Sequence, residues 1–276
     1  SSSHEHLYLG GAITIATANS NAAGTIEYKR ADDEFIFHID GGSFVAGVGV
    51  GIGSPLNIAS SLDLNDTYLG QSEYSHIQAT ASMITDVDDA HVQVQESSLR
   101  GIVSSTIRGN GMNLDHIMGV TVDGDSIIGG QVSRSHVRAD VAHIRQVSDS
   151  FLQGARFTGQ QIQRSTVVAQ DAELVQVNGA TIDAANAVVR GVRDVTVEVM
   201  DSTVVGVSDT DITGQGLDVR QVQDSVIEAD RSRVAQVQGA TIIGSDHMIL
   251  NADMAMVQGK GNVVMASDGA NVLGDD

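Results

Sequence analysis

Hydrophobic and polar positions repeat with a fifteen-residue period from Asn57 to Asp276. When this part of the chain is written in rows of fifteen, one column is apolar in every row. Two residues later a second column is mostly Ala or Gly. Seven residues after the first, a third column is aliphatic except at Gly129 and Gly159. A strict period of this length is typical of a repeat architecture. The first column contains Leu62, Ile77, Val92, Ile107, Val122, Val137, Leu152, Val167, Ile182, Val197, Ile212, Ile227, Ile242, Val257 and Val272.

The spacing inside each row predicts β-strands. The first two columns are two residues apart, which is the side-chain period of a strand, as in Ala180–Ala184 and Ala240–Gly244. The third column lies in a second short strand such as Arg233–Val237, and Asp, Gly, Asn, Ser and Gln between the strands favour turns. A helical period of 3.6 residues would drift across this frame. We therefore predict an all-β fold, a β-solenoid or β-roll of about fifteen two-strand coils over residues 57–276.

A coil with two strands and two tight turns is thin, with room inside for one aliphatic residue facing one small residue. A further apolar column exceeds what such a coil can bury, and this predicts a homotrimeric fibre closed around a three-fold axis. A triple β-spiral is the alternative architecture, but it places Gly or Pro in a fixed turn column, whereas here Gly alternates with Ala. The surplus column contains Val132, Val147, Ile162, Val177, Val192, Val207, Val222 and Val237.

Residues 1–56 do not follow the fifteen-residue frame and predict a small antiparallel β-domain. Pro55 is the only proline of the chain and marks the expected junction between this domain and the repeats. The turns expected in the domain fall at runs of Asn, Asp and Gly. The expected strands are Leu7–Ala16, Thr25–Lys29, Glu34–Ile39 and Ser43–Val50.

Composition and charge narrow the functional classes. The net charge of −20 argues against binding to nucleic acid or to an anionic membrane. Cys is absent, which excludes disulfides and thiolate zinc sites. The longest apolar stretch, Phe44–Gly53, is too short to span a bilayer. The acidic surface either keeps a β-fibre from associating or reflects adaptation to high salt.

Four groups of residues are considered as metal or ligand sites. His4-Glu5-His6 would place two imidazoles on one face of a strand, and a trimer would multiply them, although a terminal segment without a binding role is the simpler interpretation. Asp86-Val87-Asp88-Asp89 and Asp123-Gly124-Asp125 bring carboxylates together as calcium ligands do, but ordinary turn aspartates explain them better. His76, His91 and His136 share one column and are expected to point outward. No metal or cofactor is assigned.

A glycan-cleaving enzyme needs paired carboxyl groups across a groove. Viral spikes that cleave glycans also have wider coils and aromatic platforms for the sugar. This chain has no Trp, four Tyr and five Phe, and most of these aromatic residues lie within residues 1–74. We therefore predict a non-enzymatic protein with no catalytic residues.

The segment around residues 24–55 resembles a run found in trimeric tail fibres of tailed bacteriophages. The resemblance covers Gly24–Phe37, Asp40–Gly42 and Gly49–Pro55, and the repeats from Ser245 to Asp276 resemble the β-roll heads of trimeric autotransporter adhesins. It implies a fibre or spike of a virus particle. Residues 1–56 would contact other virion proteins and the distal coils would adhere to a host receptor or glycan through multivalent binding. The resemblance supplies no catalytic motif, and the receptor-binding residues are not identified.

Three alternatives to a tail fibre stay open. They are a capsid decoration or turret protein, a glycan-degrading tailspike and a cell-surface adhesin. An autotransporter adhesin is expected to carry an export signal and a C-terminal membrane anchor. The start, Ser1–His6, has no export pattern, and we expect a virion location rather than a cell surface.

Overall fold

The computed structural model describes the backbone of residues 6–8, 12–16, 23–29, 34–45, 60–73, 75–265 and 268–274. Burial and side-chain contacts are described for residues 76–265 and 268–274. The chain forms two compact units, Ser1–Ala139 and Asp140–Asp276, whose boundary falls inside β13 (His136–Ser148). The described residues contain strands and no helix, so they include no helix that could cross a membrane.

The first strands of unit 1 pair in antiparallel fashion. β1 (His6–Tyr8) pairs with β2 (Ala12–Ala16), and both β2 and β3 (Ala23–Lys29) pair with β4 (Glu34–Val45). β4 also pairs in parallel with β5 (Ser60–Glu73), which starts the coils. A separate domain ending at residue 56 stays a prediction, because residues 46–59 lie outside the described residues.

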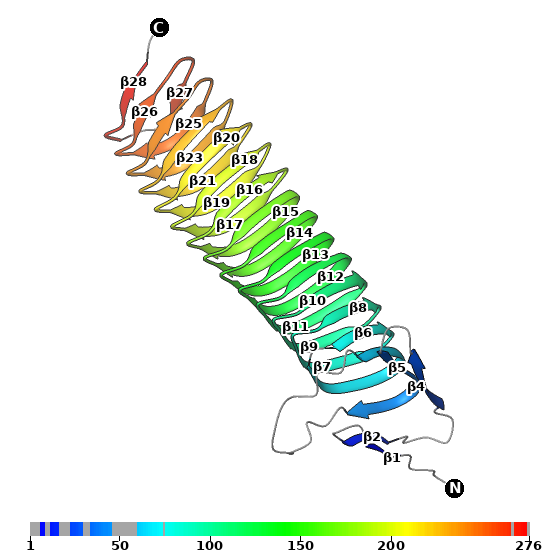
Figure 1. Cartoon of the computed structure of the whole chain (residues 1–276). Coiled ribbons are helices and arrows are strands. Elements are labelled where there is room, and N and C mark those ends of the chain that lie inside the picture. Colours follow the sequence, from blue (N-terminus) through cyan, green and yellow to red (C-terminus); the bar gives the residue numbers. More distant parts are fainter. Residues whose placement is uncertain are drawn as a thin grey trace. The chain divides into compact units, whose positions relative to one another are not determined.

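The coils of unit 1 stack in parallel with a register of fifteen residues, so that Ile77 lies beside Val92 and Ile107 beside Val122 (Figure 1). This register aligns the apolar columns, as the sequence predicts. The strands are β6 (Ser75–Thr80), β7 (Met83–Asp88), β8 (His91–Gln95), β9 (Ser98–Val103), β10 (Thr106–Asn110), β11 (Met112–Met118) and β12 (Thr121–Ser133).

Unit 2 continues the same register, with Val167 beside Ile182 and Val197 beside Ile212. The fold is a parallel β-solenoid of about 13 turns in the two units together, where fifteen coils were predicted. Its strands are β14 (Phe151–Gln163), β15 (Thr166–Asn178), β16 (Thr181–Ala185), β17 (Val188–Arg193), β18 (Thr196–Met200), β19 (Thr203–Ser208), β20 (Asp211–Gln215), β21 (Asp218–Gln223), β22 (Val226–Asp230), β23 (Arg233–Gln238), β24 (Thr241–Ile243), β25 (Met248–Asp253), β26 (Met256–Gln258), β27 (Val263–Met265) and β28 (Asn271–Leu273).

Each regular coil turns three corners, not the two that the sequence predicted. In the coil of β16 and β17, the left-handed backbone falls at Asn186 (φ 50°), Gly191 (φ 64°) and Asp194 (φ 52°). The corner at Gly191 lies inside β17, so the two strands of this coil enclose three sides. Three sides enclose more interior than two, and more residues therefore point inward.

The larger interior removes the argument for a trimer that the surplus apolar column supplied. All eight residues of that column, from Val132 to Val237, are buried within the chain and at most 2% exposed. The small column behaves as predicted, because Ala184 is buried and a Cβ built on Gly214 would lie 1.8 Å from the carbonyl oxygen of Val199. The solenoid therefore buries its own columns without a second copy.

Serines at the corners face inward, although the sequence suggested that they belong to exposed turns. Ser165 is buried, and its hydroxyl donates to the carbonyl of Gln163 (2.6 Å) and accepts from the N–H of Ser150 (3.2 Å) in the adjacent coil. The same arrangement holds at Ser97, Ser105, Ser135, Ser202, Ser225 and Ser232. These hydroxyls satisfy backbone groups that a corner takes out of the strand ladder.

Candidate binding surface

The interior of the described coils offers almost no reactive group. The buried polar side chains there are Ser and Thr, with His247 as the exception, and no Asp, Glu, Lys or Arg of the described residues is buried. The remaining interior is apolar, formed by aliphatic and small residues together with Met112 and Phe157. Any binding or catalytic chemistry in the described part therefore lies on its outer surface.

His247 occupies an inward position at a corner and is 1% exposed. Neither ring nitrogen of His247 has a hydrogen-bond partner. The backbone N–H of the same residue donates to Oδ1 of Asn262 (3.1 Å). Burial lowers the pKa of His247, and backbone carbonyl groups and Asp230 offset part of this effect. The neutral ring is therefore the form that the folded coil favours.

The predicted histidine column points outward, as expected. His76, His91 and His136 are all exposed, and the rings of His76 and His91 lie 5.1 Å apart between their centroids. Their exposure places them on the solvated face of the coil. In the described residues they join no cluster of three or more metal-binding side chains.

The acidic groups behave as turn and surface residues. Asp86 and Asp89 adopt left-handed backbone at corners (φ 55° and 49°), and Asp123 and Asp125 are exposed on a strand. No group of three or more His, Cys, Asp or Glu able to hold a metal occurs in the described residues. His4 and Glu5 lie outside those residues, as does the side chain of His6.

A charged depression of about 380 Å³ lies in unit 2 over Phe157. His143, Arg156, Asp171, Glu173 and Asn186 are among its lining residues, with buried Phe157 beneath them. Asn186 donates to Oδ1 of Asp171 (3.3 Å), so this carboxylate already has one partner. This site could not be predicted from the sequence, because its residues come from separate repeats.

A second depression, which we call the glutamine groove, has a volume of about 540 Å³ in unit 2. It lies over β19, β21 and β23, and the side chains that reach it come from the third side of each coil. Buried Val207 and Val222 form its floor. No charged residue lines it. Its remaining lining residues are Gly206, Ser208, Gln221, Gln223, Gln236 and Gln238.

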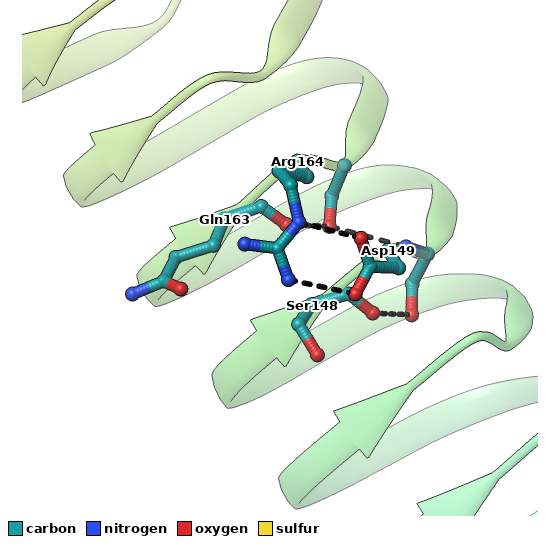
Figure 2. Close-up of polar contacts among 6 residues, drawn as sticks. Ser148, Asp149, Gln163 and Arg164 are labelled. Atoms are coloured by element: carbon teal, nitrogen blue, oxygen red, sulfur yellow. Dashed lines mark hydrogen bonds and ion pairs between the residues drawn. The ribbon is translucent and has the colours of Figure 1, made fainter.

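Ion pairs outside these depressions include one between neighbouring coils and one within β21. Figure 2 shows Arg164 donating through Nε to Oδ1 of Asp149 (2.7 Å) and through Nη2 to Oδ2 (2.9 Å), while the side chain of Gln163 extends away from the pair. The hydrogen bonds and charge of Asp149 raise the pKa of Arg164. Arg220 similarly lowers the pKa of Asp218. Both pairs are surface contacts and form no enclosed site.

Comparison with known proteins gives similarity of fold alone. No protein-family model and no curated protein matches the chain. The A-module of mannuronan C-5 epimerase AlgE6 from Azotobacter vinelandii is 12% identical over 88% of this chain and 91% of that one, with a TM-score of 0.26. The adhesin PfbA of Streptococcus pneumoniae is 8% identical, covering 78% and 83% of the two chains, with a TM-score of 0.20.

A phage protein is also among the similar structures. Tailspike protein 2 of Escherichia coli O157:H7 bacteriophage CAB120 is 10% identical over 78% of this chain and 36% of its own, with a TM-score of 0.12. Similarities this low identify no activity. No family evidence at sequence level supports a tail fibre.

Proposed function

We propose that the chain is a structural fibre or spike of a virus particle that adheres to a host surface by multivalent binding. The observation that carries this proposal is the constant fifteen-residue register, which repeats each outward position from coil to coil. Regularly spaced outward positions suit many weak contacts, because linked contacts raise the overall affinity. The interior supports a spacer role, since the inward positions of the described coils are filled by buried apolar side chains.

Attachment through residues 1–56 and a virion location are the parts of the proposal that need the particle itself. Labelling the particles with an antibody against residues 57–276 and imaging them by electron microscopy tests both. We expect label on projecting appendages. Label distributed over the capsid would favour a decoration or turret protein, and label on host cells alone would favour a cell-surface adhesin.

A homotrimer remains part of this proposal, now supported by the resemblance of residues 24–55 to tail fibres and not by the buried column. Light scattering of the purified protein tests it. A mass of three times 28.8 kDa would support the trimer, and a stable monomer would contradict it. Repeating the measurement in low and multimolar salt tests the high-salt origin, because screening stabilises a surface with a charge of −20.

Glycan hydrolysis is the second candidate function, favoured by the charged depression. It brings Asp171 and Glu173 beside His143 and Arg156, and glycosidases use paired carboxyl groups. The adhesion proposal expects no sugar release from host glycans. Release that is lost in both Asp171→Asn and Glu173→Gln would establish the enzyme instead.

A further inference from the structure

The third side of the coils in unit 2 carries glutamines where the fold does not require them. Gln146, Gln161, Gln176, Gln221 and Gln236 all adopt left-handed backbone, with φ between 54° and 59°. This conformation is unfavourable for a residue with a Cβ atom. Gly191 and Gly206 occupy the same corner in two coils and make it without that cost. The corner therefore does not explain the repeated amide.

These amides are also not used to hold the coils together. The five side chains are exposed, and none of them makes a hydrogen bond within the part of the chain that the structure describes. A ladder of amides linking one coil to the next would have explained the column as a stabilising device. Its absence among these residues leaves donors and acceptors facing solvent at every occupied coil.

The glutamine groove collects four such amides around one depression. Gln221 and Gln236 line one side, Gln223 and Gln238 the other, and Val222 lies buried between the two rows. Gln223 and Gln238 are paired in register, so the backbone positions that carry these amides are about 4.8 Å apart, the strand spacing. A sugar unit in an extended glycan advances by a similar length.

We propose that the glutamine groove binds a short stretch of neutral glycan. Each amide both donates and accepts hydrogen bonds, as sugar hydroxyl groups do. Since no cation lines the groove and the chain carries −20, an acidic sugar or a phosphate would lack a countercharge. Addition of a peptide strand is blocked, because β21 already pairs with β19 and β23. This inference rests on the proposed adhesive function and names its ligand class.

The test uses the full chain on an array of immobilised neutral oligosaccharides, with alginate and hyaluronate oligosaccharides as acidic probes. The neutral glycan that binds is then titrated calorimetrically. Gln221→Gly/Gln236→Gly removes two amides and suits the left-handed corner, as Gly206 already does. Gln146→Gly/Gln161→Gly makes the same change on the same column outside the groove and is the matched control.

We expect the groove variant to lose at least about tenfold in affinity and the control to bind like the wild type. Binding to no neutral glycan, binding to acidic probes alone, or equal affinity of both variants would overturn the inference. So would a change in oligomeric mass of the groove variant, which would assign the amides to a second copy. If cells are still bound when the glycans are not, adhesion stands and the groove assignment fails.

Discussion

Two coils of unit 2 fill the same interior in different ways. In the coil of β16 and β17, the inward pair is Ala187 and Val189, both buried. In the coil of β14, the corresponding pair is Phe157 and Gly159. A Cβ on Gly159 would lie 2.8 Å from Cε1 of Phe157 and 2.7 Å from Cδ1 of Ile162. The large and the small residue have exchanged places between the two positions.

The comparison shows that the two inward residues of a coil together fill a similar volume, although the residue in each column differs. Gly159 therefore fits the apolar column that it interrupts, because Phe157 occupies its space. Gly129 repeats the arrangement beside buried Ile127. Close packing explains the compensation, since interiors tolerate exchange of volume better than its loss or gain.

The largest effect is expected from breaking this pair. Phe157→Ala should destabilise the protein by about 3–5 kcal/mol, because it leaves a cavity against Gly159. Phe157→Ala/Gly159→Leu recreates the pair Ala172 and Leu174 of β15 and should recover most of the stability. Urea denaturation measures both. Additive losses in the double variant would contradict volume sharing between the two positions.

A smaller effect separates inward from outward serines. Ser165→Ala removes only the hydroxyl, leaves the carbonyl of Gln163 and the N–H of Ser150 without it, and should cost about 1–3 kcal/mol. Ser148→Ala is the control, because its hydroxyl makes no hydrogen bond within the described residues. An equal change in the unfolding midpoint of both variants would show that the corner hydroxyls contribute nothing.

The serines also mark the limit of what the sequence could predict. The period and the aliphatic columns identified strands, register and small slots such as Ala184, because a buried ladder demands uniform residues. Ser165 was interpreted as a turn residue, because a serine in the sequence looks the same whether its hydroxyl faces solvent or the inside of a corner. Because that corner was not predicted, the expected coil was too thin to bury the column of Val192, and this column was interpreted as a trimer contact.

The candidate surfaces were harder to predict than the fold. The charged depression joins His143, Asp171 and Asn186 from separate repeats, and only the coil register brings them together. The fifteen-residue spacing of Gln221 and Gln236 is visible in the sequence. Their left-handed backbone and the lack of side-chain hydrogen bonds, which suggest a binding role, are visible only in the structure.

A pH-dependent loss of stability is expected at the buried His247. Burial lowers its pKa below the ordinary value of 6.5, so the unfolded chain binds a proton first as the pH falls. Stability is complete above about pH 6.5 and should fall below it, by up to about 1.4 kcal/mol per pH unit. His247→Asn, which copies Asn262 of the next coil, should reduce this loss, measured by urea denaturation at pH 7.5 and 5.5. An equal loss in the wild type and the variant would contradict the assignment to His247.

The smallest effect is expected at the outer ion pair, although its hydrogen bonds are short. Arg164→Gln removes both bonds to Asp149, yet the two side chains are 63% and 43% exposed. Solvent screens such a pair, and holding two mobile side chains together costs conformational entropy. We expect no measurable shift of the unfolding midpoint at physiological salt. A shift as large as that of Ser165→Ala would mean that the coils are held together from outside as much as from within.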